Sequence, residues 1–263
     1  MANKNNLWEQ LEEAAQCVQA FCGTPPKVAV VLGSGLGALK GLLDNPQSMA
    51  YEDIPHFPKA SVAHHPAKLY VGDVQGLSVL FFDGCLHSYE GLSAREVAFP
   101  VYLAKQLGVE TVIVTNSAGG LKESMIPGDI MLITDHINKT GQSPLIGDYD
   151  YRFGPRYPSM HEPYDRVLQE LIRGDVAHEG VYVGIVGPEM ETPIEAKILG
   201  RQGADVVGMS TVLETIAAVQ SGMKVLGLSV ITDSVVSGGG EPVLPKAAKE
   251  AAQKAVNTIG YSG

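Results

Sequence analysis

The sequence predicts a single α/β domain in which buried strands alternate with helices. Short, almost entirely apolar runs recur along the chain, as in residues 27–32 and 111–115, and such runs are typical of strands covered on both faces. Segments with apolar residues at helical spacing lie between them, as in residues 7–21. No internal repeat, low-complexity tract or linker interrupts the 263 residues, so we expect one domain spanning residues 1–263.

The other elements follow from the same two patterns, together with capping residues before helices and Gly or Pro after strands. The expected helices are residues 7–21, 93–107, 164–173, the segment that follows Thr192, 211–221 and 246–259. The expected strands are residues 27–32, 68–71, 77–82, 111–115, 129–134, 181–186, 204–207 and 224–232, with a hairpin turn within 72–76. Residues 139–163 show no clear period, and a loop of this length is usually functional or covers an interface.

The composition is that of a compact globular enzyme. Hydrophobic residues make up 45% of the chain and charged residues 18%, which argues against disorder. A formal net charge of −10 argues against general binding to nucleic acid or anionic membranes. The three cysteines form no disulfide framework, and we see neither a membrane span nor a signal peptide. We therefore expect a soluble, cytoplasmic protein.

Several of the expected strands run into loops of small and polar residues. The loops are GSGLG at 33–37, NSAGG at 116–120, GPEMET at 187–192, GMST at 208–211 and Asp233-Ser234. Because strand ends of one α/β sheet gather around a common crevice, these loops predict one ligand site.

The GSGLG loop has two explanations. Its backbone could cradle a phosphate, or it could be only a tight strand-to-helix turn. Gly33, Gly35 and Ala38 fit the looser dinucleotide pattern G-x-G-x-x-A. However, the dinucleotide motif also needs a second strand that ends in an acidic residue a set distance further on. Residues 50–66 are instead predicted to form a Pro-containing loop. No Lys-Ser/Thr pair follows the glycines either, so the loop is not a Walker motif.

Two carboxylates at strand ends are candidates for the chemistry. Glu191 lies between Pro188, which should end a strand, and Thr192, which should cap a helix that begins with Pro. Asp233 closes an otherwise apolar strand. Either could bind a heterocycle or move a proton, although most acidic side chains are simply solvated. Ser210 or Thr211 should cap another helix, whose first N–H groups could hold an anion, although Ser210 could also serve only as a cap.

His87 follows a buried strand beside Tyr89 and Glu90, which favours contact with a ligand over a purely structural role. No HExxH or paired CxxC spacing supports a zinc site. Cys85 could be a nucleophile, but no sequence feature lowers its pKa, which favours a small buried thiol.

Taken together, these motifs resemble the trimeric purine nucleoside phosphorylase family, whose relatives include methylthioadenosine phosphorylase. The likeness runs from KVAVVLGSGLGAL through HSYEG, VTNSAGGL, GDIMLITDHIN and RFGPRYPSM to GPEMETPIEAK, GADVVGMST and VITD. It implies a mixed, distorted β-barrel core surrounded by helices. It also implies phosphorolysis of purine ribo- and deoxyribonucleosides to the free base and the (deoxy)ribose 1-phosphate, with no metal or organic cofactor.

The resemblance also implies a role for each matching residue. The proposed phosphate contacts are Ser34, His65, His87, Ser117 and Ser210. The proposed ribose contacts are Tyr89 and Met209, and the base pocket comprises Asn116, Ala118, Tyr182, Met190, Glu191 and Asp233. His87, Glu191 and Asp233 would carry catalysis. Tyr157 matches an aromatic residue that enters the neighbouring subunit's site, which implies a homotrimer.

Three positions depart from the family pattern. Cys85 replaces a phosphate-binding Arg, a loss worth about 2–5 kcal/mol unless Lys68 or Arg95 compensates. Asp233 replaces the usual Asn of 6-oxopurine enzymes, and a carboxylate can accept from a 6-amino group. The family's His near the 5′-OH has no counterpart at residues 241–242. These departures leave two alternatives: a methylthioadenosine phosphorylase, or a nucleoside-binding relative with impaired catalysis.

Overall fold

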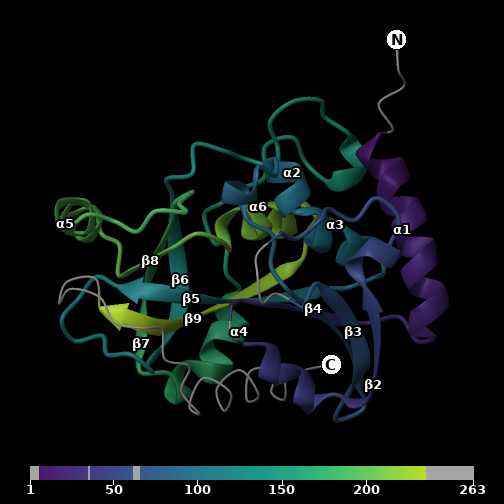
Figure 1. Cartoon of the computed structure of the whole chain (residues 1–263), viewed down its shortest axis with the longest axis horizontal. Helices are drawn as coiled ribbons and strands as arrows, with labels where there is room; N and C mark the ends of the chain where they lie inside the picture. The colour runs from purple at the N-terminus through teal and green to yellow at the C-terminus, as the bar shows by residue number, and fades with distance from the viewer. Residues whose placement is uncertain (1–5, 35, 62–65, 235–263) are drawn as a thin grey trace.

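A computed structural model describes residues 6–34, 36–61 and 66–234. Figure 1 shows a central sheet with helices on both sides. The helices are α1 (Leu7–Cys22), α2 (Ala94–Val97), α3 (Phe99–Gln106), α4 (Arg166–Ile172), α5 (Pro193–Arg201) and α6 (Val212–Gln220). The strands are β1 (Val28–Leu32), β2 (Asp44–Ala50), β3 (Lys68–Val74), β4 (Leu77–Asp83), β5 (Thr111–Gly120), β6 (Ile130–Asn138), β7 (His178–Gly184), β8 (Val206–Gly208) and β9 (Lys224–Ser234).

Within the described residues, the strands form one mixed, nine-stranded sheet that closes on itself. Its order is β2-β3-β4-β1-β5-β8-β7-β6-β9, and β9 also pairs with β5. The strands β5, β8, β7, β6 and β9 therefore form a closed barrel, and the other four extend from it. This arrangement confirms the α/β class and the barrel core that the resemblance implied.

The apolar strands are covered on both faces, as their sequences predict. Along β1, Ala29 and Val31 contact the core that contains α1, α3 and α6 residues, while Val28, Val30 and Leu32 contact a second core. The second core includes residues of α4, and Figure 1 shows α4 on the side of the sheet opposite α2, α3 and α6. Alternation of side chains along a strand produces this division.

Within the described residues most expected elements are present, and three differ. Strand β2 was not expected, because its polar sequence DNPQSMA is exposed at the edge of the sheet. The expected helix 93–107 is two helices, because Pro100 cannot donate a backbone hydrogen bond and α3 begins around it. Strand β5 continues through the NSAGG segment, which was expected to be a loop, because its backbone pairs with β9. The expected helix 246–259 lies outside the described residues.

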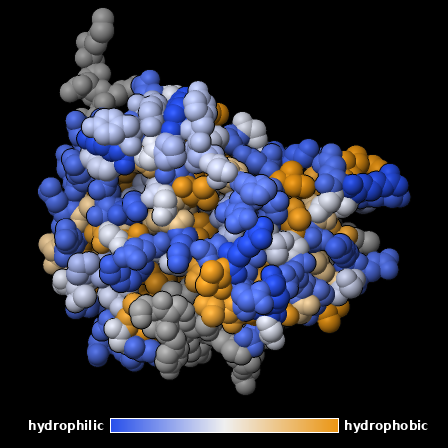
Figure 2. All heavy atoms as spheres, turned by 180° about the vertical axis from the view of Figure 1, so that it is seen from behind, coloured by the Kyte–Doolittle hydropathy of each residue, from blue (hydrophilic) through white to orange (hydrophobic). Residues whose placement is uncertain are grey.

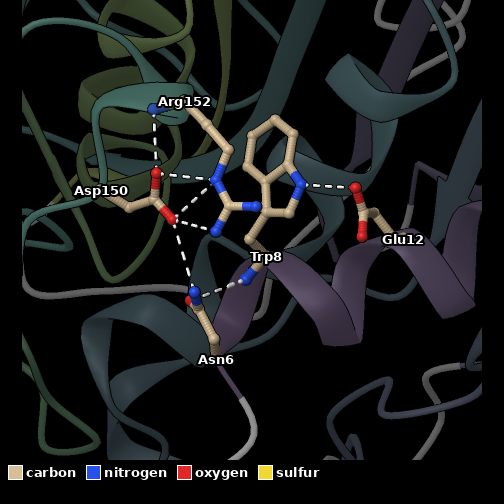
Figure 3. Close-up of polar contacts among 5 residues, drawn as sticks. All are labelled: Asn6, Trp8, Glu12, Asp150 and Arg152. Carbon is tan, nitrogen blue, oxygen red and sulfur yellow. Dashed lines mark hydrogen bonds and ion pairs between the residues drawn. The ribbon is translucent and has the colours of Figure 1, made fainter.

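The long segment 139–163 is anchored to the start of helix α1. Asn6 caps α1 and its side-chain amide donates to Asp150 at 3.5 Å (Figure 3). Asp150 also forms an ion pair with Arg152, whose guanidinium carbon lies 4.7 Å from the centre of the Trp8 ring. The hydrogen bonds from Arg152 lower the pKa of Asp150 to about 2. The segment is therefore held by charge and ring contacts although it contains little regular structure.

Most of the exposed large hydrophobic residues lie in two parts of the chain. Those in the long segment are Ile146, Tyr149, Tyr151 and Tyr157, and those in or near α5 are Met190, Ile194 and Ile198. On the face shown in Figure 2, hydrophobic side chains are scattered among hydrophilic ones. None of the helices in the described part of the chain is long and apolar enough to span a membrane.

Candidate active site

The loops that were expected to share a crevice do so. One cavity of about 520 Å³ is lined by the carboxyl-terminal ends of β5, β8 and β9 and by loops that follow other strands of the sheet. The expected site residues that line it are Ser34, His87, Tyr89, Asn116, Ser117, Ala118, Met190, Glu191, Met209, Ser210 and Asp233. The structure thus brings together groups that the sequence spreads over about 200 positions.

Strand direction explains this convergence. Strand β1 is parallel to β4 and β5, and β5 is parallel to β9, so their carboxyl ends lie at one edge. Strand β7 is parallel to β8, which places Gly184 opposite Gly208 near the same edge. The edge of the sheet at the carboxyl ends of its strands is the usual location of ligand sites in α/β proteins.

Close approach of two backbone segments fixes the start of the loop that follows β1, at Gly33. A Cβ at Gly33 would lie 2.6 Å from the Asn116 Cα, so a larger residue cannot occupy this position. The Gly33 N–H donates to the Thr115 hydroxyl at 3.2 Å, and the Ser117 hydroxyl donates to the Ser34 carbonyl at 2.9 Å. The Ser34 loop is therefore fastened to β5 directly beside the cavity.

His87 is held by its neighbours in the HSYEG motif. Glu90 accepts from the His87 N–H at 2.8 Å and faces His87 Nδ1 at 3.3 Å, which directs Nε2 toward Cys85 Sγ at 3.4 Å. The Tyr89 ring stacks on the imidazole with centroids 4.6 Å apart. Burial pushes the pKa of Glu90 upward, but hydrogen bonds from Ser61 and His87 outweigh it and lower the pKa. Glu90 is thus an ionised partner that orients the imidazole.

Cys85 lines the cavity, but its environment does not favour the thiolate that a nucleophile needs. It is 3% exposed, and burial raises the pKa of its thiol. The thiolate is the reactive form of cysteine, so this environment favours the interpretation of a small buried thiol.

Neither expected substitute for the missing Arg lines this cavity. The Arg95 guanidinium donates to the carbonyls of Pro144 and Asp148, and it lines a separate cavity of about 1000 Å³ beside the long segment. Lys68 is exposed on β3. In the described part of the chain, the phosphate-contact candidates that line the cavity are therefore hydroxyl, imidazole and backbone groups.

The two strand-end carboxylates share the other part of the cavity. Burial raises the pKa of Glu191, and the charge of Asp233 raises it further. Glu191 Oε2 is buried and has no hydrogen-bond partner among the described residues. The Thr232 hydroxyl donates to Asp233 Oδ1 at 3.2 Å. A buried, unpartnered carboxylate oxygen is costly, so its position favours pairing with a ligand donor.

Two expected site residues within the described part of the chain do not line the cavity. Tyr182 lies beneath it, fully buried, and its hydroxyl accepts from the Ser210 N–H at 3.2 Å. Tyr157 is 90% exposed in the long segment. His65 lies outside the described residues.

Sequence reasoning missed Glu214, which supports the Ser210 loop. Of the two residues expected to cap α6, Thr211 rather than Ser210 occupies the N-cap, and Glu214 accepts from the Thr211 N–H at 2.8 Å. The spacing T-x-x-E is the signature of a capping box and could have identified the pair. Within the described residues, no group of three or more His, Cys, Asp or Glu side chains could hold a metal ion.

Comparison with known proteins identifies the family to which this fold and site belong. Residues 27–261 match the family model of the Phosphorylase superfamily. Purine nucleoside phosphorylase 1 of Bacillus subtilis is 44% identical over 232 residues, which cover 86% of each chain.

Solved structures agree with this assignment. The crystal structure of the purine nucleoside phosphorylase from Schistosoma mansoni in complex with acetate has a TM-score of 0.86 at 33% identity, covering 95% of this chain and 96% of that chain. The Schistosoma mansoni enzyme in complex with adenosine has a TM-score of 0.82 at 32% identity, covering 96% and 93%. The chain belongs to the purine nucleoside phosphorylase family.

Proposed function

We propose that this protein is a purine nucleoside phosphorylase, which cleaves purine ribo- and deoxyribonucleosides with inorganic phosphate. The observation that carries the proposal is the buried oxygen of Glu191, which has no hydrogen-bond partner in the described part of the chain. It shares one cavity with Asp233 and with the hydroxyl and imidazole groups of the other loops. The similarity to named purine nucleoside phosphorylases supports the same activity.

Within the cavity, each end suits one part of the substrates. Phosphate binds near Ser34, His87, Ser117 and Ser210, with His65 as a further contact, and ribose binds near Tyr89 and the Met209 backbone. The purine lies near Asn116, Ala118 and Met190, with Glu191 on its N1–H side and Asp233 on its N7 side. Tyr182 supports the pocket from beneath, through the Ser210 N–H.

The reaction breaks the bond between the ribose C1′ and the purine N9 and forms a bond from C1′ to a phosphate oxygen. Positive charge develops on the sugar while the bonding electrons move into the purine. Phosphate stabilises the sugar, and a proton or hydrogen bond at N7 stabilises the departing base. Each effect is worth about 2–4 kcal/mol. The reaction uses no organic cofactor or metal ion.

Asp233 extends the proposal to the choice of base. Its charge raises the pKa of Glu191, so the two carboxyl groups interact across the pocket. An ionised Asp233 accepts from a 6-amino group, and a protonated one donates to N7. We therefore include adenosine and methylthioadenosine among the substrates to be tested.

Two further features belong to the proposal. Tyr157 is exposed in the anchored long segment, which fits an aromatic residue that enters a neighbouring subunit's site in a homotrimer. The three cysteines are unpaired, which fits the reducing cytoplasm as the location.

The test is release of the free base from inosine, guanosine, adenosine and methylthioadenosine, each measured with and without phosphate. Phosphate-dependent release from at least one of them is expected. No release from any nucleoside would contradict the proposal. Nucleoside binding without turnover, with activity gained by Cys85→Arg, would instead identify a relative with impaired catalysis.

A further inference from the structure

The segment that presents Ser210 to the cavity contains an unusual turn. The Val212 N–H donates to the Ser210 carbonyl at 2.8 Å, and Thr211 between them has φ 72° and ψ −48°. This is a γ-turn with positive φ, which is rare and strained. For a β-branched residue such as Thr, positive φ is especially unfavourable. A strained turn of this kind persists only where surrounding groups hold it.

The groups that hold the turn are buried side chains. Thr211 is 1% exposed, its N–H donates to Glu214 Oε2 at 2.8 Å, and its hydroxyl accepts from Asn116 Nδ2 at 2.8 Å. On the other side, the Ser210 N–H donates to the Tyr182 hydroxyl at 3.2 Å. The Ser210 hydroxyl lies 3.3 Å from the Thr211 hydroxyl, so moving Thr211 would also move the hydroxyl that lines the cavity.

Glu214 is more deeply buried than a helix cap requires. Glu96 makes the same contact with the Ser93 N–H at 2.8 Å from an exposed position. Glu214 is 2% exposed, and its second oxygen, Oε1, has no hydrogen-bond partner among the described residues. Burial raises the pKa of Glu214 to about 7. A carboxyl group in this environment destabilises the core, so its presence needs a reason other than capping.

We propose that Glu214 is a positioning residue for phosphate binding, because its carboxyl oxygen holds the Thr211 turn that aims the Ser210 hydroxyl into the cavity. This inference rests on the proposed function, in which Ser210 contacts phosphate. What the turn requires of residue 214 is a hydrogen-bond acceptor at the position of Oε2, where it accepts from the Thr211 N–H. A side chain that keeps this acceptor therefore preserves the turn, and one that withdraws it does not.

The test compares Glu214→Ala, Glu214→Asp and Glu214→Gln with the wild-type protein, using the KM for phosphate, the KM for the best nucleoside, and kcat. Glu214→Ala should raise the KM for phosphate about tenfold or more, the effect of losing a hydrogen bond to a carboxyl group. Glu214→Asp keeps the charge but withdraws the acceptor by one methylene, so it should raise the same KM. Glu214→Gln keeps the acceptor and should stay near wild type. The KM for the nucleoside should change little in all three.

Glu96→Ala is the matched control, because it removes the same capping contact from Ser93, whose turn contributes no residue to the site cavity. Its phosphate KM should equal that of the wild type. If Glu214→Ala does not fold, Glu214→Asp against Glu214→Gln decides the question. An unchanged phosphate KM in the Ala or Asp variant, or an equal rise in both KM values, would overturn the inference. If the wild-type protein itself releases no base, it is the proposed function that fails.

Discussion

The buried carboxyl group of Glu214 should make the stability of the protein depend on pH between 5 and 8. Burial raises its pKa from 4.5 to about 7 in the folded protein. Well below pH 4.5 the group is protonated in both the folded and the unfolded state and contributes no difference. As the pH rises, the unfolded chain ionises first, so the folded state loses stability until the pH passes about 7.

The size of this effect follows from the pKa change. One pKa unit corresponds to about 1.4 kcal/mol, so the full loss is about 3 kcal/mol. The glutamine side chain of the Glu214→Gln variant cannot ionise, so this variant should not lose stability in this way. Between pH 5 and pH 8, the free energy of unfolding of the Gln variant should therefore rise by about 2–3 kcal/mol relative to that of the wild type.

Urea unfolding at pH 5, 6, 7 and 8 measures this difference, with fluorescence of the single tryptophan, Trp8, as the signal and a fixed protein concentration. The groups coupled to Glu214 include Tyr164, Tyr182 and Cys85, and burial raises the pKa of each, so they stay neutral in this range. Other titrations are shared by both proteins and cancel. A difference that stays constant from pH 5 to pH 8 would refute the conclusion that burial controls this carboxyl group.

Three more predictions concern the cavity and its edge. Glu191→Gln should lower kcat/KM for the nucleoside by about 100-fold while leaving the KM for phosphate unchanged, because it replaces the proposed purine anchor; steady-state kinetics with each substrate varied decide this. Asp233→Asn should shift preference from adenosine toward inosine by at least about tenfold, measured as a ratio of kcat/KM values, and an unchanged ratio would exclude Asp233 from base selection. Thr192→Ala should lower the free energy of unfolding by about 1 kcal/mol through loss of the α5 cap, without changing the KM for phosphate; equilibrium denaturation and the same kinetic assay test both parts.

The sequence alone determined the local structure and the candidate residues. Apolar runs identified the buried strands, because a strand covered on both faces needs apolar side chains at every position. Thr192 and Pro193 located the start of α5, because a cap and a first-turn proline act within a few residues. The polar loops after several strands identified Ser34, His87, Glu191 and Asp233, which line one cavity.

The tertiary structure decided everything that depends on distant segments. Pairing of β5 with β9 closes the barrel and turns the NSAGG loop into strand, and no local pattern encodes that pairing. The exposed edge strand β2 exists because β3 provides hydrogen bonds that its own polar sequence does not predict. The strained turn at Thr211 likewise needs Glu214 and Asn116 in a common buried position. Burial and long-range hydrogen bonding set these features, because they arise only when the whole chain is folded.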